Sequence, residues 1–432
     1  MKYVSLANNE QTASFKQAVI QGLAPDKGLY YPAYIPQWKS SFVEKIPELS
    51  NLEIALEAMR PFVDEDLNLS ELEQILDDVL SFEFPLQQVG KYYSLELFHG
   101  PTLAFKDVGA RFMAKCLGRF IQDEQNQKVT VLVATSGDTG GAVANGFLGV
   151  EGIDVVILYP SGKVSPIQEK QLTTLGQNIT ALEVQGTFDD CQSMVKRAFV
   201  DPELTSKVRL TSANSINVAR WIPQMLYYIF VYKTLKNMRI QEHPVFSVPS
   251  GNFGNICAGM LAHKMGLPVA HFIACNNTND TVVDFMKTGV YRPKDTVATI
   301  SNAMDVGNPS NFVRILELFN KQKKALEFDF TALSYSDSET KVAMQEIYNQ
   351  FNYVADPHGA VAYLGLQAYM AKNPTTAGVF LETAHPSKFI DVVESTLDIE
   401  VSIPENVRFL MNREKQSILT SNYEDLKSFL LQ

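Results

Sequence analysis

Five short apolar runs alternate with longer stretches of helical pattern, and this alternation constrains the fold more than any other feature. The runs cover residues 129–133, 155–158, 244–248, 269–274 and 378–381. Such alternation predicts parallel strands joined by crossover helices, and therefore an α/β fold. Because open α/β sheets bind ligands at the carboxyl ends of their strands, we expect a functional site in the turns that follow these runs.

The size and charge of the chain limit the domain organisation and the kinds of partner that it can have. Its 432 residues exceed the roughly 250 to 300 that one hydrophobic core serves, so we expect more than one domain. Apolar residues make up 46% of the chain and charged residues 20%, which is typical of a folded protein. With 48 acidic against 37 basic residues the net charge is −11, a field that repels nucleic acid and anionic membranes. An anionic substrate would therefore need a local basic pocket.

The sequence predicts a cytoplasmic protein without a metal site or a disulfide framework. Four cysteines occur without zinc-type spacing, and we expect them to be reduced and mostly buried: Cys116, Cys191, Cys257 and Cys275. The first residues lack the basic and apolar regions of a signal peptide and the composition of a transit peptide. No apolar run reaches the roughly 18 residues of a membrane span.

A change of pattern near residue 85 predicts a domain boundary. Before it, Ser70 and Glu73 have the spacing of a capping box. Apolar residues then recur at the spacing of one helix face, at Leu72, Ile75, Leu76, Val79 and Leu80. We therefore expect a mainly helical N-terminal domain over residues 1–85 and a catalytic core over residues 86–432.

A glycine-rich turn after the run 244–248 is the first candidate for anion binding. It consists of Gly251, Asn252, Phe253, Gly254 and Asn255, and it precedes a helix-like stretch over residues 256–265. Glycines let the backbone approach a phosphate, and a helix N-terminus stabilises the anion. A strand-to-helix turn also requires glycine for its geometry alone. Neither a Walker loop nor a dinucleotide fingerprint is present, so a compact phosphate ester fits better than a nucleotide.

Two further segments carry residues suited to chemistry. The turn that begins at Ser136 and includes Asp138 and Thr139 offers hydroxyls and backbone donors for a carboxylate, although helix capping explains the same residues. Lys106 follows an apolar stretch, where burial would lower the pKa of its amine and make it a nucleophile. Taken alone, a lysine is more often a solvated surface charge.

The three motifs together resemble a known family. In the order Leu103 to Asp107, Ser136 to Gly140 and Gly251 to Asn255, they are similar to the fold type II pyridoxal-phosphate enzymes of the tryptophan synthase β family. Within that family, the segment Glu96 to Asp107 and the N-terminal region resemble the threonine synthases of bacterial and fungal type. The resemblance covers essentially the whole chain. It implies two open, mostly parallel sheet domains with helices on both faces, the smaller one mobile and formed by about residues 110–200.

The resemblance also implies roles for the residues of these motifs. Lys106 would hold pyridoxal 5'-phosphate as a Schiff base, and the turn from Gly251 to Asn255 would bind its phosphate. The loop with Ser136, Asp138 and Thr139 would lie beside the cofactor ring and grip the substrate carboxylate, although many relatives carry Asn in place of Asp138. Thr383 would be the hydroxyl partner of the pyridine nitrogen. The plainer interpretation of Thr383 is a cap at the end of a strand, and the plainer interpretation of the nearby His385 is a histidine buried in the core.

The segment from Asn214 to Arg220 resembles the one that binds the substrate phosphate, with Ser215 and Arg220 as ligands and a helix beginning near Asn214. A surface or stacking arginine is the plainer interpretation of Arg220. The implied reaction converts O-phospho-L-homoserine and water into L-threonine and phosphate, and the implied state is a monomer. Two alternatives remain: a dehydratase or β-replacement enzyme, which needs no second phosphate site, and a metabolite sensor, against which an intact Lys106 argues.

Overall fold

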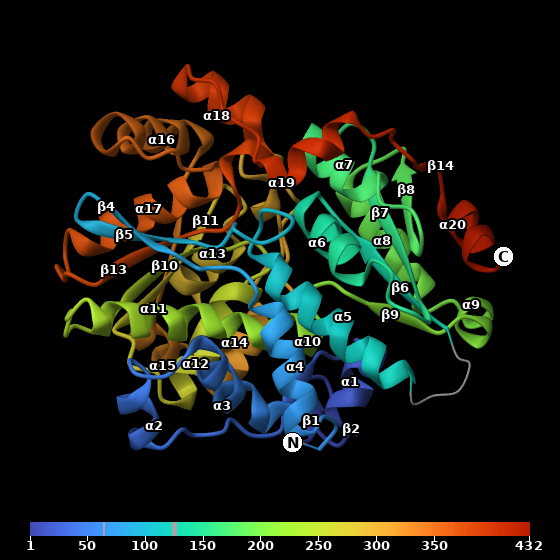
Figure 1. Ribbon diagram of the computed structural model, residues 1–432, viewed down its shortest axis with the longest axis horizontal. Helices are drawn as coiled ribbons and strands as arrows, with labels where there is room; N and C mark the ends of the chain where they lie inside the picture. The colour runs from blue at the N-terminus through green and yellow to red at the C-terminus, as the bar shows by residue number, and fades with distance from the viewer. Residues whose placement is uncertain (64, 123–127) are drawn as a thin grey trace.

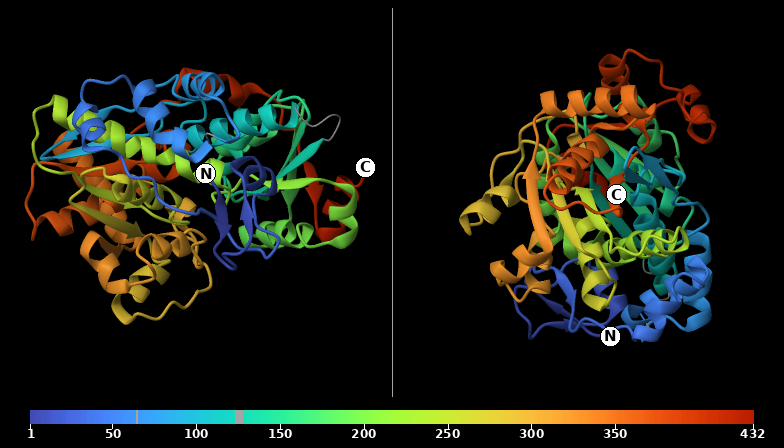
Figure 2. Two further views of the ribbon diagram at one scale, coloured as in Figure 1. Left: turned by 90° about the horizontal axis from the view of Figure 1, so that it is seen from below. Right: turned by 90° about the vertical axis from the view of Figure 1, so that its left-hand side faces the viewer.

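The protein is built around two sheets that lie side by side. The computed structural model describes residues 1–63, 65–122 and 128–432. Helices cover both faces of each sheet, and the N-terminal segment lies along one side of the pair (Figure 1, Figure 2). This confirms the prediction of an α/β fold with two mostly parallel sheets. None of the described helices combines the length and apolar character needed to cross a membrane.

The larger sheet has six strands in the order β12-β11-β10-β13-β5-β4. Neighbouring strands are parallel, except for β4 and β5, which pair antiparallel at one edge. Their bounds are β4 (Leu86–Val89), β5 (Tyr92–Glu96), β10 (Val245–Pro249), β11 (His271–Asn276), β12 (Phe330–Ser334) and β13 (Gly378–Glu382). Three of the five predicted strands fall on β10, β11 and β13.

The smaller sheet has five parallel strands in the order β14-β8-β7-β6-β9. Their bounds are β6 (Val129–Ala134), β7 (Ile153–Pro160), β8 (Ile179–Val184), β9 (Leu210–Ser212) and β14 (Ile418–Thr420). The two remaining predicted strands fall on β6 and β7. Strand β14 comes from the C-terminal segment and pairs with β8, so the smaller sheet draws on two distant parts of the chain.

The helices around the two sheets include α5 (Lys106–Gln122), α6 (Asp138–Phe147), α7 (Pro166–Thr173), α8 (Phe188–Ala198), α10 (Val218–Trp221), α11 (Met225–Asn237), α12 (Gly254–Met265), α14 (Phe312–Leu318), α17 (Pro357–Met370) and the 3₁₀ turn η3 (Pro386–Phe389). Further helices are α9 (Pro202–Lys207), α13 (Thr281–Thr288), α15 (Lys323–Asp329), α16 (Asp337–Phe351), α18 (Ile390–Leu397), α19 (Glu405–Arg408) and α20 (Tyr423–Leu430). Helix α5 packs against α6 and α10 and so joins the part of the molecule with the larger sheet to the part with the smaller sheet.

The N-terminal region contains a small sheet as well as helices. Its three short antiparallel strands, in the order β2-β1-β3, are β1 (Tyr3–Ser5), β2 (Thr12–Ala13) and β3 (Tyr30–Pro32). The helices are α1 (Phe15–Gln21), α2 (Ser40–Lys45), α3 (Asn51–Val63) and α4 (Leu69–Val79). The end of α1 contacts the core directly, because the Val19 carbonyl accepts hydrogen bonds from the side chains of Thr211 and Asn217.

The predicted capping box of α4 is wrong by two residues. The box is formed by Asn68, which accepts from the Glu71 amide, and by Glu71, whose carboxylate accepts from the Asn68 amide. Asn is as good an N-cap as Ser, and a start at Asn68 adds half a turn of helix before the apolar face begins. The apolar face itself is confirmed, since Leu72, Ile75, Leu76 and Val79 are buried.

The main hydrophobic core is continuous from the N-terminal region through α5 into both sheets. Tyr3, Phe112 and Trp221 are fully buried within it. All four cysteines are free and buried, as predicted. The core therefore fixes the position of α5, which begins with Lys106, relative to both sheets.

Candidate active site

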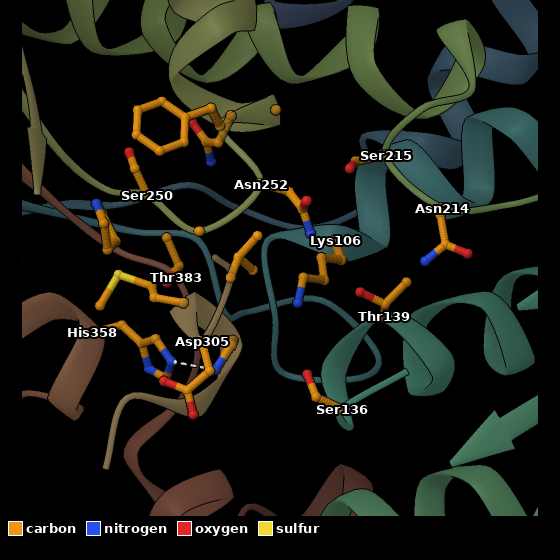
Figure 3. A pocket seen from close by; sticks show the side chains of 18 of the residues that line it. Lys106, Ser136, Thr139, Asn214, Ser215, Ser250, Asn252, Asp305, His358 and Thr383 are labelled. Atoms are coloured by element: carbon orange, nitrogen blue, oxygen red, sulfur yellow. Dashed lines mark hydrogen bonds between the residues drawn. The ribbon is translucent and has the colours of Figure 1, made fainter. Parts of the chain in front are cut away.

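A cavity lies where the carboxyl ends of strands from both sheets converge. Its lining includes the turns that follow β6, β9, β10 and β13, together with the start of α5 and the segment 302–306. Of the twelve residues predicted for the site, eleven line this cavity: Lys106, Ser136, Thr139, Ser215, Arg220, Gly251, Asn252, Phe253, Gly254, Asn255 and Thr383. Figure 3 shows Lys106 among the surrounding polar side chains. Asp138 is the exception.

Lys106 and Thr383 are brought together by a short antiparallel contact. The Phe105 amide donates to the Thr383 carbonyl at 2.9 Å, and the His385 amide donates to the Leu103 carbonyl at 3.0 Å. Between these bonds, Ala104 forms a bridge with Ala384. The segment before α5 is thus fastened to the segment after β13, and Lys106 enters the cavity next to Thr383.

The surroundings of Lys106 favour its neutral amine. Burial lowers the pKa of Lys106 to about 8; the charges of Lys388 and Arg220 lower it as well, whereas Asp138 raises it. At a pH near 8 about half of the amines are neutral, which is the form that attacks a carbonyl. The arrangement supports the predicted nucleophilic role.

The turn from Gly251 to Asn255 ends in the N-terminus of α12. Phe253 is the N-cap residue, with a left-handed φ of 61°, and no side chain caps the helix. Cys257 is the first residue whose amide bonds back to Phe253, so the amides of Gly254, Asn255 and Ile256 are free to hold an anion. The predicted phosphate-binding geometry is therefore present.

Close packing fixes this turn from behind. A Cβ atom on Gly251 would lie 2.7 Å from the Ala303 carbonyl oxygen and 2.8 Å from the Met304 Cα, so only glycine fits. The Asn252 side-chain oxygen accepts from the amide and the hydroxyl of Ser310. The segment before α14 thus holds the turn in one conformation.

Asn255 presents a buried donor without a partner in this structure. Its side-chain oxygen accepts from the Tyr228 hydroxyl at 2.5 Å, which fixes the amide orientation. Its Nδ2 atom is buried and has no hydrogen-bond partner. A buried unpaired donor costs free energy of about 1 to 3 kcal/mol, and an anion in the cavity would remove that cost.

The turn at the start of α6 supplies the second set of backbone donors. Gly137 has a φ of 134°, and the Thr135 hydroxyl oxygen accepts from the amides of Gly137 and Gly140 at 2.9 and 2.8 Å. The amides of Gly137 and Gly140 are thus occupied, which leaves those of Asp138 and Thr139 for a ligand, and Ser136 and Thr139 line the cavity. This geometry suits a carboxylate, as the sequence predicts.

Asp138 does not line the cavity. Its carboxylate accepts from Gln168 at 2.9 Å and pairs with the Lys388 ammonium at 2.8 Å, and both members of the pair are buried. Although burial opposes ionisation, the charges of Lys388 and Lys106 hold the pKa of Asp138 well below its ordinary value. The structure thus places Asp138 behind the turn as the partner of a buried lysine.

Arg220 and Ser215 lie on one segment, but the helix predicted to begin near Asn214 begins later. Helix α10 starts at Val218, with Asn217 as its N-cap, because the Asn217 side chain accepts from the Ala219 amide. The preceding residues 214–217 form a turn, closed by the Asn217 amide on the Asn214 carbonyl at 3.1 Å, and Asn214 and Ser215 line the cavity. The prediction of a helix dipole at Asn214 is wrong, since α10 has only four residues and begins past Ser215.

Arg220 is a buried cation that faces the cavity. Its Nη1 donates to the Ala213 carbonyl at 2.6 Å, while its Nε has no partner. Burial lowers its pKa to about 10, so it stays charged at neutral pH. A Cβ atom on Gly109 would lie 2.4 Å from the Arg220 carbonyl oxygen, so α5 and α10 touch through their backbones. This contact fixes Arg220 relative to Lys106.

The sequence did not single out the wall opposite these residues. His358 lines the cavity, with its Nδ1 3.1 Å from the Asp356 carboxylate and its Nε2 accepting from the Ala303 amide (Figure 3). Asp305 lies near Ala303 in the segment 302–306, and burial raises the pKa of the Asp305 carboxyl to about 6. The only sequence signal is the helix start at Asp356 and Pro357, which does not indicate a site.

The residues present fit pyridoxal phosphate. They include a lysine with a lowered pKa, an uncapped helix N-terminus for a phosphate, a buried amide donor without a partner, and a hydroxyl at Thr383 beside the lysine. A second set of donors at α6 and a buried arginine remain for the substrate. The cavity thus presents donors for two anionic groups of ligands around one amine.

Comparison with known proteins places the chain in a family. The family model described as pyridoxal-phosphate dependent enzyme matches residues 84–380, and the models for the threonine synthase N terminus and C-terminal region match residues 2–80 and 359–430. Threonine synthase from Haemophilus influenzae is 43% identical over 437 residues, which covers all of both chains.

Two solved structures agree over the full length. The crystal structure of threonine synthase from Escherichia coli has a TM-score of 0.92 and 40% identity, and covers 100% of this chain and 99% of that one. The pyridoxal-phosphate-bound threonine synthase from Brucella melitensis has a TM-score of 0.90 and 33% identity, with the same coverage. Pyridoxal phosphate is therefore the cofactor of this fold, and the chain belongs to the threonine synthase family of pyridoxal-phosphate-dependent enzymes.

Proposed function

We propose that this chain converts O-phospho-L-homoserine and water into L-threonine and phosphate, with pyridoxal 5'-phosphate bound at Lys106. One observation carries the proposal: a single cavity holds two separate sets of anion donors and a buried arginine around one lysine. A cofactor phosphate occupies one set. The remaining donors match the carboxylate and the phosphate of a doubly anionic substrate, which a dehydratase for serine or threonine does not need.

Each group of the substrate has a natural place in the cavity. The carboxylate meets the start of α6, where Ser136 and Thr139 add hydroxyls to the free backbone amides. The phosphate meets Arg220 and Ser215; a guanidinium donates charge-assisted hydrogen bonds to phosphate, and the Ser215 hydroxyl is oriented by the Asn311 side chain at 3.0 Å. These contacts place the α and β carbons beside Lys106.

Lys106 is the group that moves protons in this proposal. When bound, pyridoxal phosphate supplies an electron sink for the negative charge that develops next to the amino group of the substrate. With a pKa of about 8, Nζ of Lys106 accepts a proton from the α carbon and returns it later. The same amine accepts a proton from the β carbon, and phosphate leaves from the γ carbon with the electrons of the C–O bond. The γ carbon then takes up a proton to become a methyl group, the hydroxyl of water adds to the β carbon, and the remaining proton of water goes to the released phosphate.

Other residues of the chain hold the geometry and limit access of water. Thr383 offers a neutral hydroxyl for the pyridine nitrogen, which does not enforce protonation as a carboxylate would. Arg220 stabilises the leaving phosphate through its positive charge. Phe188 and Gln192 on α8 line the cavity from the smaller sheet, so a movement of that half would exclude solvent from the reaction.

The protein is further proposed to act as a monomer in the cytoplasm. The cavity is lined by groups from one chain, including both sets of anion donors and Lys106, so the site needs no residue from a second copy. Light scattering on the purified protein at micromolar concentration tests this, with the mass of one chain as the expected result and the mass of a dimer as the contrary one.

The test of the proposed reaction is a balance of products. Purified protein with cofactor is incubated with O-phospho-L-homoserine, and threonine, phosphate and keto acid are measured together. The proposal requires threonine and phosphate in equal amounts. Keto acid in place of threonine would indicate a dehydratase-like enzyme, and no release of phosphate would reject the substrate.

A further inference from the structure

Lys388 is a fully buried lysine that the reaction above does not use. Its side chain has no exposed surface, and its ammonium contacts three oxygen atoms. These are the Asp138 carboxylate at 2.8 Å, the Thr102 carbonyl at 2.8 Å and the Gln171 side-chain oxygen at 3.0 Å. An ammonium has three donors, so each has one acceptor.

The three acceptors come from three different parts of the site. Thr102 lies in the turn before Lys106 and is held by Asp107, whose carboxylate accepts from the Thr102 amide and hydroxyl. Asp138 is the first residue of α6, the helix that begins at the carboxylate-binding turn. Gln171 lies on α7 and also donates to the Thr102 carbonyl at 3.1 Å. The lysine therefore joins the cofactor segment to two helices of the smaller sheet.

Lys388 itself lies in the part of the molecule that contains the larger sheet. It lies in η3, the turn that follows β13, five positions after Thr383. A single ammonium thus connects the Thr383 segment, the Lys106 segment and the start of α6.

Stability alone does not explain a buried ion pair at this place. Removing two charges from water costs several kcal/mol per ion, and well-packed apolar residues of the same volume are often as stable. A buried ion pair favours one relative position of the two segments that carry it. If either segment moves, a buried charge is left without its partner, which costs free energy. The arrangement fixed here is that of the two halves of the cavity.

We propose that Lys388 is a positioning residue that fastens the carboxylate-binding turn of α6 to the segment carrying Lys106. The substrate bound at that turn is thereby held at a fixed position relative to the Lys106 amine. The inference rests on the proposed function and extends it. Asp138 then acts on the reaction through Lys388 and has no direct contact with the reacting atoms.

The same pair balances the charges around Lys106. After burial, which is the largest influence, Asp138 raises the pKa of the Lys106 amine, while Lys388 and Arg220 lower it. Loss of Lys388 alone leaves the Asp138 charge without its partner. The amine should then hold its proton more strongly, and loss of both members should largely restore the original balance.

The experiment compares the wild type with Lys388→Met, Asp138→Asn and the double variant. The first readout uses apoprotein: the rate of covalent cofactor uptake is measured against pH, since only the neutral amine reacts. The second is kcat and KM with O-phospho-L-homoserine. Lys427→Met is the matched control. Lys427 lies on α20, away from the cavity, and pairs with Asp201 at 2.9 Å.

The proposal predicts a distinct pattern. The uptake midpoint rises by about one pH unit in Lys388→Met, falls in Asp138→Asn and returns near the wild-type value in the double variant. The double variant regains thermal stability, yet its kcat stays about 10- to 100-fold low, because the fastening is still absent. Lys427→Met keeps the wild-type midpoint and kcat.

Two outcomes would overturn it. One is an unchanged midpoint together with kcat within twofold of wild type in Lys388→Met. The other is full recovery of kcat in the double variant, which would make the pair a matter of charge compensation only. If Lys388→Met does not fold, the double variant and Gln171→Met are judged on kcat alone. The proposal requires both to stay well below wild type, and kcat within twofold of wild type in both would overturn it. The uptake readout needs no substrate, so it stands even if the proposed reaction fails.

Discussion

Two helix N-termini face the same cavity, and they are held in different ways. The turn before α12 is fixed by backbone packing: Gly251 touches the backbone of Ala303 and Met304, and Asn252 is bound by Ser310. The turn before α6 is fixed by side chains, with Thr135 accepting from two amides and Asp138 bound by Lys388 and Gln168.

The difference matches the ligands assigned to the two turns. A cofactor that stays through many turnovers suits a turn that cannot deform without displacing backbone. A substrate that enters and leaves suits a turn held by side chains, here Thr135, Gln168 and Lys388, because side-chain contacts adjust more readily than packed backbone. On the proposed assignment, the turn before α12 holds the cofactor permanently and the turn before α6 holds the exchanging substrate.

The largest effect is expected from Gly251→Ala. The added Cβ would lie 2.7 Å from a carbonyl oxygen, so the backbone of the turn must shift. We expect cofactor affinity to fall by about 100-fold, the equivalent of roughly 2.7 kcal/mol. The measurement is a titration of apoprotein with pyridoxal phosphate.

Gly137→Ala is the matched variant on the other turn. Its Cβ would meet Gln168 at 2.4 Å and its φ of 134° disfavours a side chain. It should lower kcat/KM for the substrate and leave the cofactor titration within threefold of wild type. Equal loss of cofactor affinity in both variants would break the comparison.

Arg220→Met should act chiefly on the substrate, since Arg220 shifts the pKa of Lys106 less than Asp138 or Lys388 does. It removes a buried guanidinium from the phosphate end of the cavity, and a charge-assisted hydrogen bond contributes about 1.5 to 3 kcal/mol. The expected loss in kcat/KM is about 10- to 100-fold, with cofactor affinity unchanged. Steady-state kinetics and the cofactor titration check both parts, and Arg220→Lys, which keeps the charge without the planar fork, should lie between.

Thr135→Val should loosen only the α6 turn. Valine keeps the shape of threonine but cannot accept from the amides of Gly137 and Gly140, which would lose their partner. We expect kcat/KM to fall by about tenfold, since each buried unpaired amide costs about 1 to 3 kcal/mol and the turn can move to reduce that cost. A weaker cofactor complex in this variant would show that the two turns are not independent.

Cofactor uptake should depend on pH through Lys106. Its pKa of about 8 is lowered from 10.5, so the neutral fraction rises as pH rises through 8. Between pH 8 and 7 the uptake rate should drop by about fivefold, following the neutral fraction of a group with this pKa. Stopped-flow absorbance on apoprotein measures it, and a rate that is flat over this range would mean that the amine is neutral throughout.

Local patterns predicted much of the fold and of the site. Strands such as β6 and β10 are short apolar runs that end in small-residue turns, and the signals for strand, turn and helix lie within about twenty residues. For the same reason the two candidate anion-binding turns could be identified before the structure, whereas the role expected of Lys106 came from the family resemblance. Their convergence follows from the rule that parallel strands end at one edge.

Features that depend on distant contacts could not be predicted. Strand β14 has three residues and becomes a strand only because β8, more than 230 residues earlier, offers an edge. The partner of Asp138 is Lys388, a contact that no local pattern records. The strands of the N-terminal sheet have two or three residues each, too short for a period to emerge.

The most direct test of the central claim is to locate the cofactor on the chain. Holoenzyme is reduced with borohydride, digested and analysed by mass spectrometry, with Lys106→Ala treated in parallel. The account predicts a single modified lysine, Lys106, and no modified peptide in the variant. Modification of a different lysine, or equal modification in Lys106→Ala, would contradict it.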